Sequence, residues 1–345
     1  MVKLMRTFRH SVVLQRRQRH HALMEAQRYP EDYDGIVAGA FAGIDWTALM
    51  FGELWTGVNS SVKGPDFDLP QPQLNLLTGA VLEQCAGTDG GVASDAFLND
   101  PRQCRFDPHK LQCKSGQDPS TCLTASQLQA VDAIYQGASN PRTHHQIWPG
   151  FVAGSETFWR QVLVGNPSAP GGSSASFFRD GVFAGQSGFD FLNINFDSDV
   201  ALSDRAEIAA VNAVNPDLRR FFARGGKLLL VDGWNDTSVP PKVAINYYRA
   251  VVEKTGDKQV RESMRFFMVP GMGHGPGTAG VENFNYDALG VIEQWKQTGK
   301  APEELTFDHY KDGMMVGKRL VCQYPKVPTY KGSGNTEDTS SFVCK

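Results

Sequence analysis

Two short apolar runs, each followed by a glycine-containing polar loop, constrain the fold of this chain more than any other feature. Residues 227–231 read Lys-Leu-Leu-Leu-Val and follow two glycines, and residues 266–269 read Phe-Phe-Met-Val. Such short, continuous apolar runs are typical of parallel strands that are covered on both faces. Residues 241–254, between the two runs, have the pattern of a helix. The sequence therefore predicts a strand–helix–strand unit within an α/β fold.

Further elements of the same kind occur elsewhere in the chain. Residues 20–29 carry good helix formers and stop at Pro30, and residues 36–38 form a short apolar run. This order predicts a helix, a turn and a buried strand. Three more helices are predicted, over residues 74–85, over residues 124–137 with a capping box of Thr124 and Gln127, and over residues 286–297.

Charge and hydropathy argue against two classes of partner. The chain has 345 residues with 34 Lys and Arg against 37 Asp and Glu, a net charge of −3, so no general binding of nucleic acid is expected. No apolar stretch reaches about 18 residues, so no membrane partner is expected. Residues 1–24 are basic, and the first acid is Glu25. Three interpretations of this basic N-terminal segment remain open: it is a targeting segment, an arm that binds nucleic acid, or damaged sequence.

The six cysteines indicate disulfides and an oxidising compartment. They form neither a Cys-x-x-Cys pair nor a zinc-ligand pattern, and four of them lie in one loop-rich stretch. Sequence alone leaves the connectivity open, and unpaired thiols are the alternative. Pairing between neighbours along the chain is the simplest arrangement, which would join Cys85 to Cys104, Cys113 to Cys122 and Cys322 to Cys344.

Each of the two predicted strands leads to a candidate catalytic side chain. Asp236 follows the first strand in Asp-Gly-Trp-Asn-Asp, and His274 follows the second in Pro-Gly-Met-Gly-His-Gly. Ligands of α/β folds bind beyond the carboxyl ends of the strands, and the order Asp then His matches the last two members of an α/β-hydrolase triad. Asp236 would fix the tautomer of His274, which would carry the proton. A capping aspartate and an inert loop histidine are the alternative.

The nucleophile that such a triad requires is not evident. It should lie on a strand-to-helix turn just before the helix at residue 20, but no Gly-x-Ser-x-Gly occurs there. Ser11 is the only nearby hydroxyl, and it lacks the glycines that allow a tight turn. The sequence therefore predicts two members of a triad without the third.

Several separate blocks carry a family resemblance. The longest, residues 22–40, reads Ala-Leu-Met-Glu-Ala-Gln-Arg-Tyr-Pro-Glu-Asp-Tyr-Asp-Gly-Ile-Val-Ala-Gly-Ala. Shorter blocks are residues 80–85, 100–108, 122–124 and 317–325, the last of which continues to Cys344. Together and in this order, the blocks resemble the tannase/feruloyl esterase family, which also includes the bacterial mono-hydroxyethyl terephthalate esterase.

The resemblance implies an α/β-hydrolase core with a large inserted, disulfide-rich lid. It implies serine esterase chemistry on small aromatic (phenolic) esters, the same three local disulfides, and a secreted or periplasmic protein. Lid aromatics such as Trp148, Phe151 and Trp159 are candidates for stacking on the substrate, with a position in the core as the alternative.

Departures from the family pattern bear on activity. Family members have Cys-Ser-x-Gly-Gly-Arg at the nucleophile and a cysteine after the catalytic histidine, whereas here Gly275 follows His274 and the missing serine aligns near Arg16. The resemblance also implies that the N-terminal part of the core, with one oxyanion-hole donor, and the signal peptide are missing from this chain. We therefore expect the chain as it stands to be inactive. The alternative function is that of a non-catalytic pseudoenzyme or fragment with a calcium-binding lid.

The resemblance also divides the chain into parts. We expect an aberrant basic start at residues 1–21, the first part of an incomplete hydrolase core at 22–70, a lid domain at 71–200, and the second part of the core with a tail at 201–345. Codons for residues 13–18, read one base later, permit Cys-Ser-Asn-Gly-Gly-Arg. We therefore hypothesise that residues 1–21 are a frameshifted or misassigned start, which sequencing of the gene would test.

A glycine-rich acidic loop in the lid is a candidate calcium site. Residues 88–95 read Thr-Asp-Gly-Gly-Val-Ala-Ser-Asp and lie where the family binds calcium through spaced aspartates and carbonyls. Hard oxygen ligands suit calcium, which makes Asp89 and Asp95 the candidate ligands of a structural ion. However, Ala86 replaces the first aspartate of the family, and the loop is two residues longer. Turn-forming aspartates in a solvated loop are the alternative.

Overall fold

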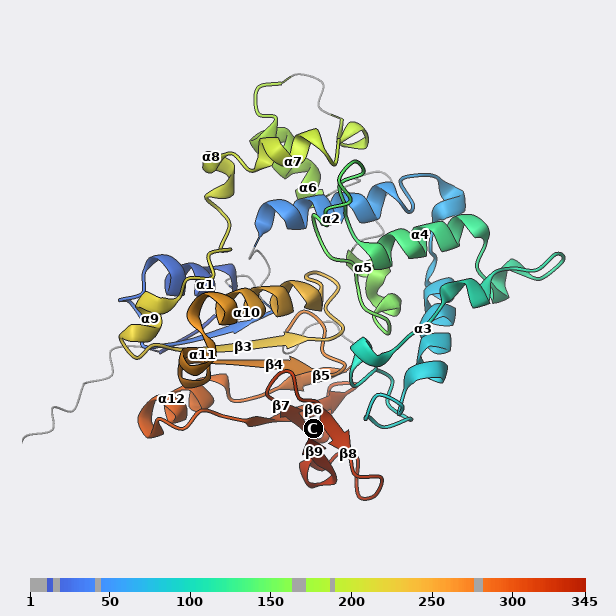
Figure 1. Ribbon diagram of the computed structural model, residues 1–345. Coiled ribbons are helices and arrows are strands. Elements are labelled where there is room, and N and C mark those ends of the chain that lie inside the picture. Colours follow the sequence, from blue (N-terminus) through green and yellow to red (C-terminus); the bar gives the residue numbers. More distant parts are fainter. Residues whose placement is uncertain (1–10, 15–18, 41–44, 163–171, 187–189, 276–281) are drawn as a thin grey trace, which may run out of the picture.

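A sheet of four parallel strands forms the centre of the molecule (Figure 1). The computed structural model describes residues 11–14, 19–40, 45–162, 172–186, 190–275 and 282–345. The strands lie in the order β1-β2-β3-β4, and the predicted strands at 36–38, 227–231 and 266–269 are confirmed as three of them. Their bounds are β1 (Ser11–Leu14), β2 (Gly35–Gly39), β3 (Lys227–Gly233) and β4 (Met264–Val269).

Strands β2, β3 and β4 are buried on both faces, which explains the continuous apolar runs. Along β3, Leu228 and Leu230 belong to one hydrophobic core, whereas Leu229 and Val231 belong to a second core, and all four are completely buried. Successive side chains of a strand point to opposite faces, so a doubly covered strand needs apolar residues at every position. The first core includes residues of α1 (Arg19–Arg28), α9 (Arg219–Ala223), α10 (Pro241–Thr255) and α11 (Asp257–Ser263), and the second includes residues of α12 (Ala288–Thr298).

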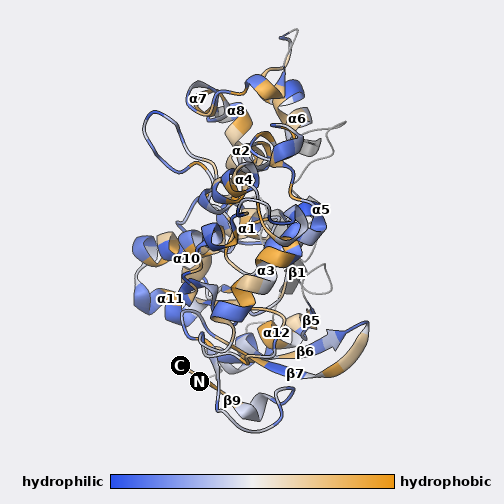
Figure 2. Ribbon diagram, turned by 90° about the vertical axis from the view of Figure 1, so that its right-hand side faces the viewer, coloured by the Kyte–Doolittle hydropathy of each residue, from blue (hydrophilic) through white to orange (hydrophobic). Residues whose placement is uncertain are grey.

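The C-terminal region adds antiparallel strands that the sequence analysis did not predict. β5 (Asn283–Asn285), β6 (Glu304–Lys311) and β7 (Met314–Cys322) form one sheet, and β8 (Pro328–Tyr330) pairs with β9 (Phe342–Cys344). Phe307 of β6 and Val321 of β7 belong to the second core, which also includes residues of α12. The far end of the β6–β7 hairpin is apolar and exposed at Met314, Met315 and Val316, as Figure 2 shows in orange.

A helical layer covers the end of the sheet toward which β3 and β4 point (Figure 1). Helix α2 packs against α4, α6 and α8, and Leu49, Met50, Phe51 and Leu54 of α2 also belong to the first core, which lies against the sheet. The capping box of Thr124 and Gln127 is confirmed, and Gly137 ends that helix with a φ of 77°. The helices of the layer are α2 (Trp46–Val58), α3 (Gln71–Cys85), α4 (Ala125–Gln136), α5 (Trp159–Val162), α6 (Gly172–Phe177), α7 (Ser198–Ser203) and α8 (Ala206–Ala209).

Much of the remaining chain consists of short turns. Within the described part, every helix is too short or too polar to cross a bilayer. Single helical turns occur at Pro65–Phe67, Pro101–Gln103, Pro108–Leu111, Pro119–Thr121, Glu156–Phe158, Phe178–Val182, Phe191–Asn193 and Thr339–Ser341.

Three disulfides hold the loop-rich parts of the chain. The pairs that the family resemblance implies, Cys85–Cys104, Cys113–Cys122 and Cys322–Cys344, are all confirmed. The first two lie in the helical layer, and the third joins β7 to β9. Because cross-links reduce the freedom of the unfolded chain, they stabilise segments that have little regular structure.

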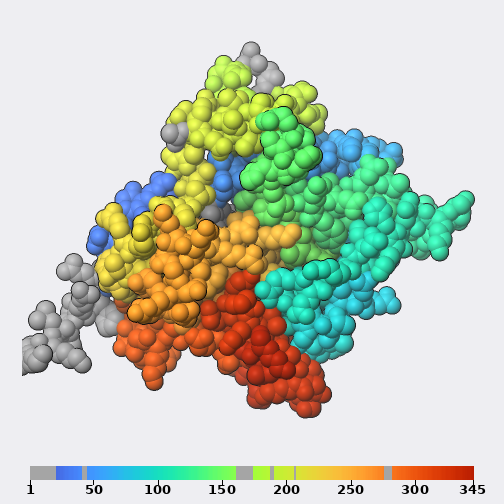
Figure 3. Space-filling view, in the orientation of Figure 1, coloured from blue at the N-terminus to red at the C-terminus, as the bar shows by residue number. Residues whose placement is uncertain are grey.

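Buried ion pairs attach the loop after α3 to the C-terminal region. Arg319 of β7 donates to both carboxylate oxygens of Asp95, at 2.7 and 3.0 Å, and to Glu337 at 3.0 Å. His309 of β6 is completely buried and hydrogen-bonds Glu337 through Nδ1 at 2.6 Å and Glu282 through Nε2. Each ring nitrogen of His309 therefore faces one carboxylate. These contacts hold the loop after α3 against the C-terminal region. Figure 3 shows the two in contact, the loop in cyan and the C-terminal region in red.

We expect acid to weaken this network. Burial opposes ionisation of Glu282 and Glu337, but hydrogen bonds from His309 and from neighbouring cations outweigh it, so the pKa of both carboxyls lies below the usual 4.5. A carboxyl whose pKa is lower in the folded state contributes stability above its unfolded pKa and loses it as the pH falls through the folded value. Urea midpoints should therefore fall below about pH 4.5.

One variant tests this pH dependence. Glu337→Gln removes one of the two carboxyls with a lowered pKa, so its urea midpoint should change less between about pH 6 and about pH 3.5 than that of the parent. Burial raises the pKa of Asp95, which has the opposite sign and offsets part of the loss. An identical pH dependence in the parent and the variant would show that Glu337 does not contribute.

Candidate active site

Asp236 lies in the loop that follows β3 and is completely buried. Its Oδ1 accepts hydrogen bonds from the backbone N–H groups of Ser238 at 2.8 Å and Val239 at 2.9 Å. A buried carboxylate is costly unless hydrogen bonds replace its water, and these two amides supply part of that replacement. They also fix the orientation of the carboxylate, which leaves Oδ2 to face the next strand.

His274 lies in the loop that follows β4, the neighbour of β3 in the sheet. Its Nδ1 donates to Asp236 Oδ2 at 2.8 Å, and its side chain is 27% exposed. A carboxylate can only accept, so this bond fixes the tautomer of the neutral ring and leaves Nε2 as the basic nitrogen. The structure therefore brings together the two residues that the sequence analysis selected as catalytic candidates.

Close contact between the two loops positions this pair. The backbone N–H of Trp234 donates to the carbonyl of Val269, and that of Asn235 donates to the carbonyl of Met272, both at 3.0 Å. A Cβ on Gly233 would lie 2.0 Å from the Met272 carbonyl oxygen, so only glycine allows this approach. Sequence reasoning missed these supporting residues, although a glycine at the end of a buried strand is the signal of a close approach.

The predicted position of the nucleophile lies in the sequence between β1 and α1. Arg16, with which the missing serine aligns, lies outside the described residues, as do all of residues 15–18. Ser11 begins β1 and pairs with Gly35 at the start of β2. Because the strands are parallel, Ser11 is at the opposite end of the sheet from Asp236 and His274. Strand β1 and helix α1 flank residues 15–18, and β1 lies two strands away from β3 in the sheet.

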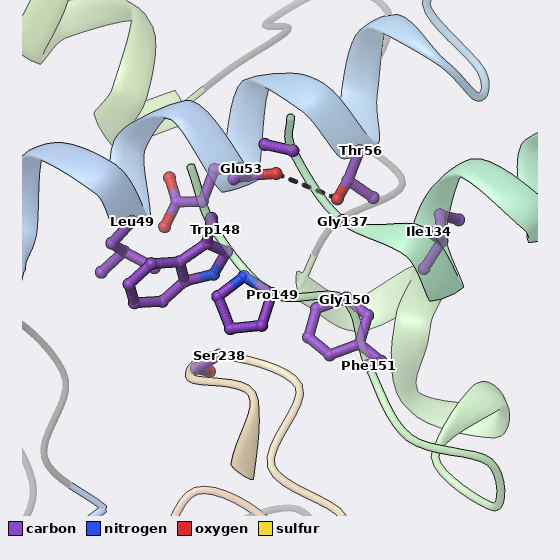
Figure 4. A pocket seen from close by; sticks show the side chains of 12 residues that line it. Leu49, Glu53, Thr56, Ile134, Gly137, Trp148, Pro149, Gly150, Phe151 and Ser238 are labelled. Atoms are coloured by element: carbon purple, nitrogen blue, oxygen red, sulfur yellow. Dashed lines mark hydrogen bonds between the residues drawn. The ribbon is translucent and has the colours of Figure 1, made fainter. Parts of the chain in front are cut away.

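A pocket between the helical layer and the Asp236 loop is the candidate substrate site (Figure 4). Trp148 and Phe151, two of the three aromatic candidates, line it together with Leu49 and Glu53 of α2, and Ser238 lines it from the core. Ser238 links the pocket to Asp236, because its backbone N–H donates to Asp236 Oδ1, although Asp236 and His274 are not themselves lining residues. The hydroxyl of Ser174 hydrogen-bonds the Glu53 carboxylate.

Trp159, the third aromatic candidate, is a core residue. Its side chain is completely buried in a cluster with Phe151, and its Nε1 donates to the hydroxyl of Ser155 at 3.0 Å. Its ring also makes an edge contact with Tyr135. With the indole N–H satisfied and its faces packed, Trp159 supports the helical layer from within.

The candidate calcium ligands do not meet at one centre. Asp89 accepts from the backbone N–H groups of Gly91, Asn99 and Asp100, whereas both oxygens of Asp95 are bound by Arg319. Among the described residues, no three His, Cys, Asp or Glu side chains are arranged to hold a metal. This arrangement does not fit a calcium ion. Comparing the melting temperature with and without a chelator is the remaining test of that prediction.

The fold and the paired loops define a class of protein. A parallel sheet with a buried aspartate and a histidine in contact at the tips of adjacent strands is characteristic of the α/β-hydrolase type. The chain belongs to the tannase and feruloyl esterase family, because the model of that family matches residues 19–345. The family predicted from the sequence is therefore confirmed.

Individual relatives are esterases and hydrolases by name. An uncharacterized esterase of Xanthomonas campestris is 36% identical over 366 residues, which cover 94% of this chain and 63% of the relative. Mono(2-hydroxyethyl) terephthalate hydrolase of Piscinibacter sakaiensis is 29% identical and is matched over 93% of this chain and 61% of its own length. The chain thus spans a little over three-fifths of these relatives. A crystal structure of an esterase from Aspergillus oryzae superimposes with a TM-score of 0.83 at 28% identity, covering 95% of this chain and 67% of that one.

Proposed function

We propose that this sequence derives from a carboxylic ester hydrolase that acts on small aromatic (phenolic) esters, with Asp236 and His274 as two members of a Ser–Asp–His triad. The observation that carries the proposal is the hydrogen bond of 2.8 Å between His274 Nδ1 and the buried carboxylate of Asp236. Family membership supports the reaction, and the names of the relatives support the substrate class. The three disulfides support a secreted or periplasmic location.

The geometry of the pair suits proton transfer in acyl exchange. A serine hydroxyl attacks the ester carbonyl while His274 Nε2 takes its proton, and the same proton then goes to the departing alcohol as the acyl-enzyme forms. Water attacks the acyl-enzyme in the same way and releases the acid. Throughout, Asp236 holds the ring in the required tautomer and stabilises the imidazolium, because its carboxylate is fixed by two backbone amides.

The chain as printed should not turn over esters. Between β1 and α1 it reads Gln-Arg-Arg-Gln at residues 15–18, without a hydroxyl or thiol that could attack a carbonyl. We expect no hydrolysis of methyl ferulate or methyl gallate above the rate of the variant His274→Ala. Turnover by the parent chain that His274→Ala abolishes would show that another nucleophile serves the site, and would overturn this part of the proposal.

The DNA around codons 13–18 provides the complementary test. If the shifted frame encodes Cys-Ser-x-Gly-Gly-Arg, the product of that frame should hydrolyse the same two esters, and Asp236→Asn or His274→Ala should remove nearly all of that activity. A shifted frame without this motif would end the frameshift hypothesis. If the product of the shifted frame contained this motif and its activity survived His274→Ala, the proposed triad would be contradicted.

A further inference from the structure

Asn235 lies where three segments of the chain meet. Its backbone N–H donates to the carbonyl of Met272, in the loop that carries His274. Its side chain is buried, at 3% exposure, and Nδ2 donates to the carbonyl of Gly154 at 2.6 Å. Gly154 precedes Asn235 by 81 residues and lies in the segment between α4 and α5 of the helical layer. One residue next to Asp236 therefore contacts both the histidine loop and the helical layer.

The helical layer holds Gly154 from the other side through Glu156. Glu156 is completely buried, and its Oε1 accepts from the backbone N–H of Gly154 at 2.7 Å and from the hydroxyl of Tyr135 at 2.5 Å. Its Oε2 accepts from the hydroxyl of Thr78 at 3.1 Å. Burial raises the pKa of Glu156, although these donors oppose the increase. Helices α3 and α4, which carry Thr78 and Tyr135, thus fix the N–H side of Gly154, and Asn235 binds its carbonyl.

The backbone at Gly154 is specific to this arrangement. Its φ of +91° lies in the region that favours glycine, and an added Cβ would meet Leu98 at 3.2 Å. The segment therefore has a defined shape, and its carbonyl is a fixed acceptor and not an adaptable one. A displacement of the layer would move this acceptor away from Asn235 as a unit.

We propose that Asn235 is a positioning residue through which the helical layer aligns Asp236 with His274. The proposal rests on the proposed role of that pair. When the helical layer is in place, the buried side-chain amide of Asn235 has its acceptor at Gly154. The loop before Asp236 is then held by the layer as well as by the histidine loop. With the layer displaced, Nδ2 loses its acceptor inside the protein, and the loop gains freedom next to the carboxylate. The pair is then fully ordered only when the layer is closed over it.

The test removes the hydrogen bond between the Asn235 side chain and Gly154, and it measures the effect on the helical layer and on His274. In Asn235→Ala, we expect amide hydrogen exchange across residues 150–158 to rise about tenfold, as expected for the loss of a buried hydrogen bond. We also expect loss of the proton NMR signal of the His274 Nδ1–H, which is identified by its absence in His274→Ala. The matched control is Asn59→Ala, which loses a partly buried Asn-to-carbonyl bond of 2.9 Å, to Trp55, within α2 of the layer. The control should leave the His274 signal unchanged.

The outcomes separate this inference from the proposed function. A normal His274 signal in Asn235→Ala would overturn the coupling, even with faster exchange in the layer, because Asn235 would then only anchor that segment. Loss of the signal in Asn59→Ala as well would also overturn it. If Asn235→Ala does not fold, Asn235→Asp, which keeps the size but removes the donor, is measured in the same way. Neither readout depends on ester turnover, so failure of the esterase proposal leaves this result standing.

Discussion

Replacing Arg319 with methionine should lower the free energy of unfolding by about 3–5 kcal/mol, the cost of leaving buried charges without a partner. Arg319 and Asp95 side chains are each 8% exposed and share two hydrogen bonds, and Glu337 shares a third. Methionine retains much of the apolar bulk between Phe97 and Phe342, whose rings lie 5.8 and 5.6 Å from the guanidinium. The loss should therefore report on charge and not on packing.

A matched pair of variants separates burial from the ion pair itself. Arg142 makes the same two-bond contact with Asp197, but its side chain is 71% exposed, so Arg142→Met should cost far less. Adding Asp95→Asn to Arg319→Met should recover part of the stability, because a neutral amide is less costly to bury than an unpaired carboxylate. Urea unfolding measures the free energy of unfolding of each of these variants. Equal, small losses in Arg319→Met and Arg142→Met would contradict a buried network.

The features that could be predicted from the sequence are those with local causes. The runs at residues 227–231 and 266–269 predicted strands because both faces of the sheet are covered, and the capping box at Thr124 fixed a helix start. The contact between Asp236 and His274 followed from topology, since parallel neighbours end at the same edge of the sheet. None of these inferences required knowledge of distant contacts.

The hairpin of β6 and β7 was missed although its signal is local. Leu305 and Phe307 are buried and alternate with more exposed residues, and Asp312-Gly313 at the turn has φ values of 50° and 77°. Asp-Gly between alternating residues is a strong hairpin signal. Asp95, in contrast, could not have been assigned from its own loop. Its partner Arg319 is 224 residues away, so a loop rich in Asp and Gly suggested calcium, while the fold supplies a guanidinium.

Gly233→Ala should be the most damaging small substitution near the site, with an expected loss of about 3 kcal/mol or more in the free energy of unfolding. The new methyl group would lie 2.0 Å from the Met272 carbonyl oxygen and 2.4 Å from that of Gly273. Both contacts are with backbone, so no side chain can turn aside. The loops that carry Asp236 and His274 must separate, which would lengthen their hydrogen bond of 2.8 Å.

The control for this variant should change stability in the opposite direction. Gly79 is exposed within α3, and an added Cβ there meets nothing within 4 Å, so Gly79→Ala should stabilise the chain by up to about 1 kcal/mol through helix propensity. Urea midpoints compare the two variants, and the NMR signal of the His274 Nδ1–H reports the pair directly. If Gly233→Ala retained both its midpoint and that signal, the loops would tolerate separation. The close approach of the two strand ends would then not be what holds the aspartate against the histidine.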